Sequence, residues 1–172
     1  MTPTANSAAA LPRSRVPYEN WRPPVIGVTL LVPVGADELL VADATGCGDI
    51  VLPTGSVEND ESPEQAAQRA LQGTRRDLPV LRQVAVNQVQ MRRRKVISHL
   101  VATHPLTHED AADLAYRDPR AVLRVLPTGQ AITELPEKAQ ARLLLGLQAL
   151  AIGVMAYLED DVVQRLESVL AS

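Results

Sequence analysis

Runs of aliphatic and β-branched residues, separated by turn-forming residues, occupy much of the chain. The run over residues 25–34 (VIGVTLLVPV) predicts a strand that is buried on both faces. The same reasoning predicts further strands over residues 38–42, 50–52, 80–89, 95–103 and 121–126, and a short helical piece over 110–116. Strands interspersed with helices indicate an α/β fold.

Residues 135–172 have apolar positions at helical spacing, which predicts helices rather than strands. The acidic run over 159–161 predicts a break between two helices. The first of them is apolar almost all round, more than one face of a sheet can cover, and Gly146 and Gly153 would allow close approach. We therefore expect C-terminal helices that pack on the core and form the interface of a homodimer.

The other end of the chain has a different composition. Residues 1–24 are rich in Ala, Pro, Ser and Thr and are typical of a flexible arm, with Tyr18 and Trp21 as anchors near its end. The sequence thus divides into an arm (1–24), a domain core (25–134) and a C-terminal helical segment (135–172).

Within the core, residues 52–76 (LPTGSVENDESPEQAAQRALQGTRR) combine a glycine turn, an acidic loop and the start of a helix. Ser62 is the predicted N-cap, Pro63 suits the first helical position, and Gln65 completes a capping box. The helix that follows has a narrow apolar face suited to packing on a sheet, made by Ala66, Ala67, Ala70 and Leu71.

The spacing of four residues in this stretch resembles the Nudix box, which reads Gly, five residues, Glu, seven residues, then Arg-Glu-apolar-x-Glu-Glu. The matching residues are Gly55, Glu61, Arg69 and Leu71. The preceding LPTG and the flanking strands extend the resemblance over residues 25–150. The match is incomplete, because other residues replace the family's three glutamates and its closing glycine: Ala70, Gly73, Thr74 and Arg76.

The resemblance implies a Nudix-like α/β/α sandwich with a mixed β-sheet, here followed by an extended C-terminal helical segment. In the family, the helix glutamates hold magnesium or manganese against a diphosphate, and such cations need several carboxylate oxygens. Ala70 and Gly73 have no ligand atoms. Glu61 and Arg69 resemble the family's structural ion pair beside Gly55. The box therefore predicts a retained scaffold with no catalytic residues and no metal cofactor.

Three functions remain open. The first is a pseudoenzyme that binds a small phosphorylated ligand or a protein partner, with these candidate ligand-binding residues: Glu58, Glu61, Arg69, Arg92 and Arg94. The second is an active Nudix hydrolase of a nucleoside diphosphate derivative, with relocated carboxylates (Glu58, Glu61 and Glu64) holding Mg²⁺ or Mn²⁺. The third is an interaction or scaffolding subunit.

Other polar clusters give weaker signals. The basic run over 92–95 falls at a predicted hairpin tip, where it would bind a phosphate or remain solvated. His99 and His104 differ by an odd number and would face opposite sides of a strand, so we expect no three-histidine metal site with His108. Cys47 has no nearby base to activate it and is predicted to be a plain turn residue.

The composition bears on the partners and the location that we expect for this protein. The formal net charge of −3 makes nucleic acid an unlikely partner, and the absence of Phe leaves few rings for stacking on a nucleobase. The longest apolar stretch, 143–158, is shorter than the roughly 20 residues of a membrane span. With no basic and apolar signal region at the start of the chain, we expect a cytoplasmic protein.

Overall fold

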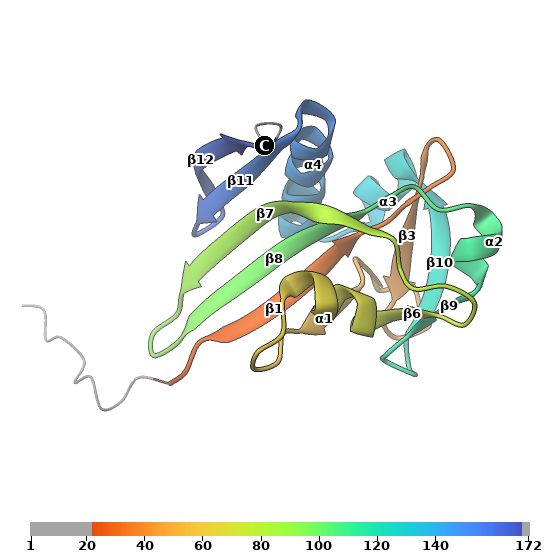
Figure 1. Cartoon of the computed structure of the whole chain (residues 1–172), viewed down its shortest axis with the longest axis horizontal. Helices are drawn as coiled ribbons and strands as arrows, with labels where there is room; N and C mark the ends of the chain where they lie inside the picture. The colour runs from red at the N-terminus through yellow and green to blue at the C-terminus, as the bar shows by residue number, and fades with distance from the viewer. Residues whose placement is uncertain (1–21, 170–172) are drawn as a thin grey trace, which may run out of the picture.

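The computed structural model describes residues 22–169, so the predicted anchors Tyr18 and Trp21, with most of the predicted arm, lie outside the described residues. The centre of the fold is a six-stranded mixed sheet in the order β12-β11-β7-β8-β1-β5 (Figure 1). Two neighbouring pairs are parallel, β1 with β8 and β7 with β11, and the others are antiparallel. The strands are β1 (Val25–Leu31), β5 (Thr54–Ser56), β7 (Val80–Gln90), β8 (Lys95–Thr103), β11 (Val154–Glu159) and β12 (Val162–Ser168).

Two smaller sheets complete the strand content. One has the order β10-β3-β2, with β4 also paired to β3, and the other is the pair β6-β9. Their strands are β2 (Pro33–Val34), β3 (Glu38–Asp43), β4 (Ile50–Val51), β6 (Leu71–Gly73), β9 (Leu114–Tyr116) and β10 (Val122–Pro127). The strands predicted over 38–42, 80–89, 95–103 and 121–126 are therefore confirmed.

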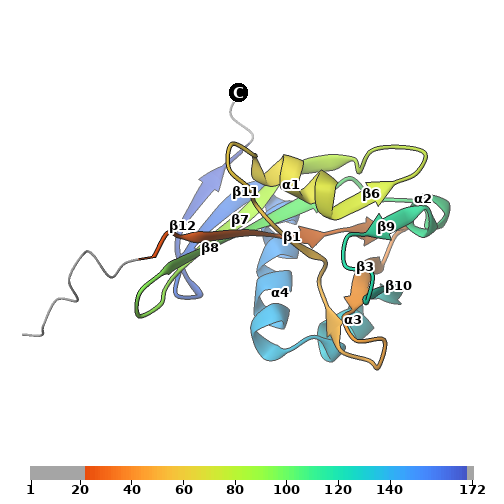
Figure 2. The same ribbon diagram turned by 90° about the horizontal axis from the view of Figure 1, so that it is seen from below.

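Helices cover both faces of the central sheet. Figure 2 shows α1 (Pro63–Ala70) on one face and α4 (Glu137–Ile152) on the other. Two shorter helices, α2 (His108–Ala112) and α3 (Thr128–Glu134), lie in the connections. The predicted α/β/α sandwich with a mixed sheet is confirmed.

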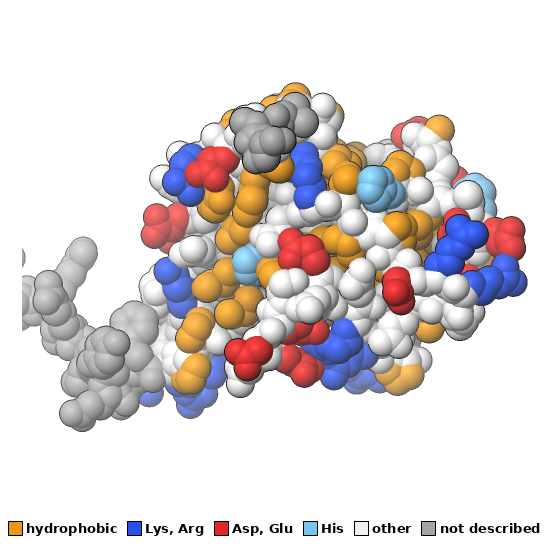
Figure 3. Space-filling model, in the orientation of Figure 1, with side chains coloured by type: hydrophobic (Ala, Val, Ile, Leu, Met, Phe, Trp, Pro, Cys, Tyr) orange, Lys and Arg blue, Asp and Glu red, His pale blue; other side chains and the backbone are white. Residues whose placement is uncertain are grey.

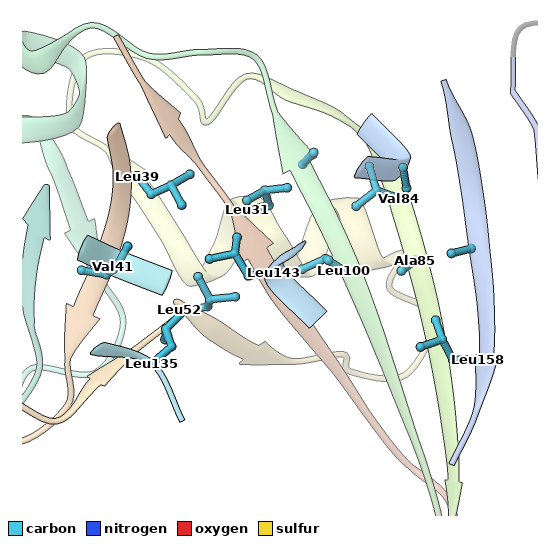
Figure 4. Packing of buried hydrophobic residues seen from close by; sticks show 14 of the residues in the cluster. Leu31, Leu39, Val41, Leu52, Val84, Ala85, Leu100, Leu135, Leu143 and Leu158 are labelled. Carbon is cyan, nitrogen blue, oxygen red and sulfur yellow. The ribbon is translucent and has the colours of Figure 1, made fainter. Parts of the chain in front are cut away.

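The core consists of two aliphatic clusters separated by the central sheet. On the α4 side, Leu143 is fully buried and lies in one cluster with Leu31 of β1 and Leu52 (Figure 4). Gly146 follows one turn later and faces the same sheet, because a Cβ atom there would overlap the side chain of Leu100. This glycine thus allows α4 to approach the sheet of its own chain, and the predicted role in packing between subunits is wrong.

The C-terminal segment differs most from prediction. One helix, α4, ends at Gly153, which caps it in the left-handed conformation (φ 70°). Residues 154–168 then form the β11–β12 hairpin instead of a second helix. Its two-residue turn is Asp160-Asp161, both with positive φ, as type I′ hairpin turns require. Because β11 joins the central sheet beside β7, the segment predicted as C-terminal helices over 135–172 contributes one helix and two strands to the fold.

Two smaller corrections concern helix and strand ends. The helical piece predicted over 110–116 is α2, and the chain then extends as β9, because residues 114–116 pair with β6. The strand predicted over 25–34 divides after Leu31 into β1 and β2, which belong to different sheets. Within residues 22–169, no helix is both long enough and apolar enough to cross a membrane.

Candidate functional site

The candidate site begins at the loop between β5 and α1, where local sequence sets the geometry. The Ser62 hydroxyl accepts a hydrogen bond from the Gln65 backbone N–H (3.2 Å), and the Gln65 side chain accepts one from the Ser62 N–H (2.8 Å). Pro63 follows the cap as the first helical residue. The predicted capping box is therefore confirmed, and it fixes where the acidic loop ends.

Glu61 and Arg69 form a bidentate ion pair across this loop. The Arg69 Nε and Nη2 atoms donate to the two Glu61 carboxylate oxygens, each at 2.8 Å. Arg69 also donates to the Ser56 carbonyl oxygen (2.7 Å), and the Glu58 N–H donates to Glu61 (3.0 Å). The hydrogen bonds from Arg69 are the main reason that the pKa of Glu61 falls from 4.5 to about 2. The predicted brace between loop and helix is present.

Glu58 extends this cluster towards solvent. Its carboxylate lies 3.1 Å from Nη1 of Arg69 and 3.5 Å from Nη1 of Arg117, and its side chain is 59% exposed. Acidic and basic side chains accordingly lie next to one another on the face that carries α1 (Figure 3). Gly55 is needed beneath the cluster, because a Cβ atom there would approach the Ala70 Cβ atom to 2.9 Å.

The positions where the family has metal-binding glutamates are built differently here. The helix ends at Ala70, which is buried, and the next three residues form β6. A Cβ atom at Gly73 would overlap the backbone carbonyl of Arg76, well inside the 3.0 Å that real Cβ atoms keep. The Thr74 hydroxyl donates to Asp113, which also accepts from the Arg75 N–H at 2.9 Å. The segment is thus a structural connection between α1 and α2.

A divalent metal does not fit the donors that remain. Glu61 is held by Arg69, and Glu58 faces two arginines, whereas Glu64 accepts a hydrogen bond from the Gln83 amide (3.1 Å) on β7. Over the described part of the chain, no group of three or more His, Cys, Asp or Glu residues is arranged to hold a metal ion. Magnesium and manganese need several free oxygen ligands, which this arrangement does not offer.

The remaining sequence candidates lie apart from this cluster. Arg92 and Arg94 belong to the turn that joins β7 to β8. In the part of the chain that the structure describes, the ion pairs of Glu58 and Glu61 involve Arg69 and Arg117, not these two arginines. His99 lies 2.9 Å from the Gln83 side-chain oxygen, and burial lowers its pKa. His108 lies 3.0 Å from Glu38. His99 and His108 therefore contact different partners, Gln83 on β7 and Glu38 on β3.

A pocket between the central sheet and α4 contains residues that the sequence analysis did not single out. Its volume is about 150 Å³, and its walls are mostly apolar, with side chains from β1, β7, β8, β11 and α4. The polar atoms in the lining come mainly from Thr29, Thr54, Asn87, Ser98 and Arg142. These residues are scattered along the sequence, and no local pattern marks Asn87, because β7 also contains Arg82 and three glutamines.

An ion-pair network joins this pocket to the C-terminal hairpin. Asn87 is 4% exposed. Its side-chain amide N–H donates to the Asp161 carboxylate (2.6 Å), and its side-chain oxygen accepts from the Asp161 backbone N–H (3.2 Å). Arg142 of α4 donates to the same carboxylate at 2.8 Å and lowers the pKa of Asp161. The hairpin turn thus orients the two polar groups, Asn87 and Arg142, that face the pocket from β7 and α4.

Comparison with known proteins identifies the fold. No family model and no curated protein matches the sequence. The solution structure of the E. coli ORF135 protein is 20% identical, with a TM-score of 0.54 over 79% of this chain and 96% of that chain. A NUDIX hydrolase from Nitrosomonas europaea is 13% identical (TM-score 0.57; 81% of this chain and 80% of that chain). A UDP-X diphosphatase is 17% identical (TM-score 0.52; 83% and 70%).

These similarities establish that the chain has the fold of the Nudix hydrolases. The resemblance based on residues 52–76 is confirmed at this level. The fold alone does not specify an activity, which depends on the residues of the site.

Proposed function

We propose that this chain is a Nudix-fold protein that binds a small ligand without cleaving it by metal-dependent hydrolysis. One observation carries the proposal: the segment that bears the family's metal-binding glutamates is here a buried alanine and a short strand, in which Gly73 has no room for a side chain. The nearby carboxylates of Glu58 and Glu61 are neutralised by Arg69, so they do not replace those ligands.

The pocket between the sheet and α4 supports the binding part of the proposal. A concave, mostly apolar cavity with a few polar groups is typical of small-molecule sites. Asn87 and Arg142 both bond to Asp161, but Asn87 keeps a second amide N–H and Arg142 keeps its Nη1 group for a ligand, beside walls formed by aliphatic residues such as Leu52, Leu100 and Leu158. A compact ligand with an apolar body and a phosphate, another anionic group or a carbonyl would match this lining.

The catalytic part is tested by assaying nucleoside diphosphates and their sugar derivatives with Mg²⁺ and with Mn²⁺. We expect no turnover above that of the protein-free control. Turnover that is lost in the Glu58→Gln, Glu61→Gln double variant would instead support the alternative of a hydrolase with relocated carboxylates. Turnover that survives this double variant would contradict both the proposal and that alternative.

The binding part is tested with the same compounds in metal-free buffer, by calorimetry and by the shift in Tm. Asn87→Leu removes the amide from the pocket, whereas Gln88→Leu makes the same chemical change at the next position of β7, whose side chain points to the opposite face of the sheet. We expect a ligand that binds the wild type and the Gln88 variant to lose at least tenfold in affinity for the Asn87 variant, as for one lost buried hydrogen bond of about 1.5 kcal/mol. Equal affinity for all three proteins would place the binding site elsewhere.

A further inference from the structure

The strand β12 forms one edge of the central sheet and is exposed along its whole length. It pairs with β11 on one side, and among residues 22–169 no strand pairs with its other side. All seven of its residues are exposed. An edge strand presents unpaired N–H and C=O groups, which proteins commonly protect with charged side chains, proline or β-bulges. The sequence of β12, VVQRLES, contains no lysine or proline, and its two charged residues, Arg165 and Glu167, are of opposite sign.

Large apolar side chains also lie exposed along this edge. The exposed fractions are 60% for Val162, 45% for Val163, 53% for Leu166 and 45% for Val169. In the corner of the molecule that carries β11 and β12, Figure 3 shows an acidic and a basic side chain beside hydrophobic ones. An edge that combines free backbone groups with apolar side chains is suited to strand addition.

The backbone of β12 shows which groups are available for pairing. The Val169 N–H donates to the Gly153 carbonyl oxygen (3.1 Å), so this residue directs its backbone groups towards β11. Backbone groups alternate in direction along an antiparallel strand. Leu166 and Ser168 therefore direct their N–H and C=O groups away from β11, towards the free edge.

We propose that two copies of this chain associate through β12, which pairs antiparallel with β12 of the second copy about a two-fold axis at Leu166. The two Leu166 residues then exchange their outward N–H···O=C hydrogen bonds. Arg165 of each copy lies opposite Glu167 of the other, and Val169 of each lies beside the 162–163 segment of the other. Such an interface is self-complementary, as two-fold symmetry requires.

Charge selects this register over its neighbours. Moving the axis to residue 165 would place the two Arg165 side chains opposite one another, and moving it to residue 167 would do the same with the two Glu167 side chains. Like charges directly opposite destabilise an antiparallel pair, whereas opposite charges stabilise it. In the single chain, Arg165 and Glu167 lie 3.0 Å apart, and Arg165 lies over the ring of Tyr157, so both charges are already held on one face of the strand.

The edge is regular where the proposal needs it. The pairing of β12 with β11 is shifted once, between the partners of Tyr157 and Leu158, which leaves Gln164 as an extra residue. From Arg165 to Ser168 the register is continuous. The proposed contact thus belongs to the hairpin rather than to the C-terminal helices from which a homodimer was first predicted, and it does not involve the ligand pocket at Asn87.

The first test is the mass of the full chain in solution, measured by sedimentation over a range of concentrations. We expect a dimer for the wild type and a monomer for Leu166→Lys, which places two ammonium groups at the two-fold axis. Val122→Lys is the matched control, because Val122 is 51% exposed on β10, a strand of a different sheet from β12; it should remain dimeric. A monomeric wild type, or a dimer that Leu166→Lys leaves intact, would overturn the proposal.

A charge-complementation experiment tests the register itself. Arg165→Glu alone puts two carboxylates opposite one another at each cross-strand pair, and Glu167→Arg alone puts two guanidinium groups there, so each variant should weaken the dimer by about tenfold or more. Mixing the two variants restores opposite charges at both pairs, and we expect a heterodimer. Each variant lacks the Arg165–Glu167 pair within its own chain, so an intrachain effect cannot produce this recovery. A mixture that stays monomeric would overturn the register.

Discussion

Gly73 gives the sharpest stability prediction, because it occupies a position where the Nudix pattern has glutamate. A Cβ atom at this position would overlap the carbonyl oxygen of Arg76, a backbone atom that cannot rotate away. Relief requires movement of the turn over residues 73–76, which Asp113 holds through Thr74 and the Arg75 N–H. Overpacking costs about 1–3 kcal/mol and a weakened hydrogen bond about 1 kcal/mol more. We therefore expect Gly73→Ala to lower the free energy of unfolding by about 2–4 kcal/mol.

The measurement is equilibrium unfolding in urea, supported by Tm, which should fall by roughly 2–4 °C per kcal/mol for a chain of this size. Gly129→Ala is the matched control, because a Cβ atom there meets nothing within 4 Å inside α3, and it should be neutral or stabilise by up to about 1 kcal/mol. Gly73→Glu restores the family's residue, yet it should destabilise at least as much as Gly73→Ala and confer no metal-dependent turnover. If Gly73→Ala is as stable as the wild type, the inference that this segment has no room for a side chain is wrong.

Three further predictions concern the core, the ion pair and the acidic loop. Leu143→Ala should lower the free energy of unfolding by about 2–5 kcal/mol in urea titrations, because Leu143 is fully buried under α4, whereas Leu144→Ala at the neighbouring half-exposed position should change it by less than about 0.5 kcal/mol. Since the pKa of Glu61 is about 2 in the folded state and 4.5 unperturbed, folding favours its ionised form. The pH-dependent stability difference between wild type and Glu61→Gln should be full above about pH 5, shrink as the pH falls from 4.5 to 2, and disappear only below pH 2; a difference independent of pH would contradict the pairing with Arg69. Asp60 has a φ of 63°, so Asp60→Val should lower Tm, by an amount equivalent to about 1–2 kcal/mol, while Asp60→Gly should not; equal losses for both would point to the Asp60 side chain instead of the backbone.

Local chemistry made the start of the candidate site predictable. The capping box of Ser62 and Gln65 needs residues only three positions apart, and it forms as the sequence indicates. The pairing of Glu61 with Arg69 follows from the resemblance to the Nudix pattern, and the capped helix presents Arg69 to the loop. The long β7–β8 hairpin also follows from two apolar runs separated by a basic turn.

The C-terminal hairpin shows why other parts could not be read in this way. Residues 154–168 have apolar spacing that fits a helix, but the alternation of Val154, Ala156 and Leu158 also fits a strand. These residues form a strand because Gly153 ends α4 and because β11 then pairs in parallel with β7. This partner strand is formed by residues some 70 positions away, as in the pair Ala156 with Ala85.

The sequence by itself determined the sheet-forming runs, the capped helix and the absence of the Nudix pattern's glutamates, because each depends on residue types at short spacing. Only the tertiary structure decided that the C-terminal end is a sheet edge, that Asp161 bridges Asn87 and Arg142, and that Gly73 has no room for a side chain. These features arise from contacts between distant segments, whose free energy outweighs the local helix and strand preferences.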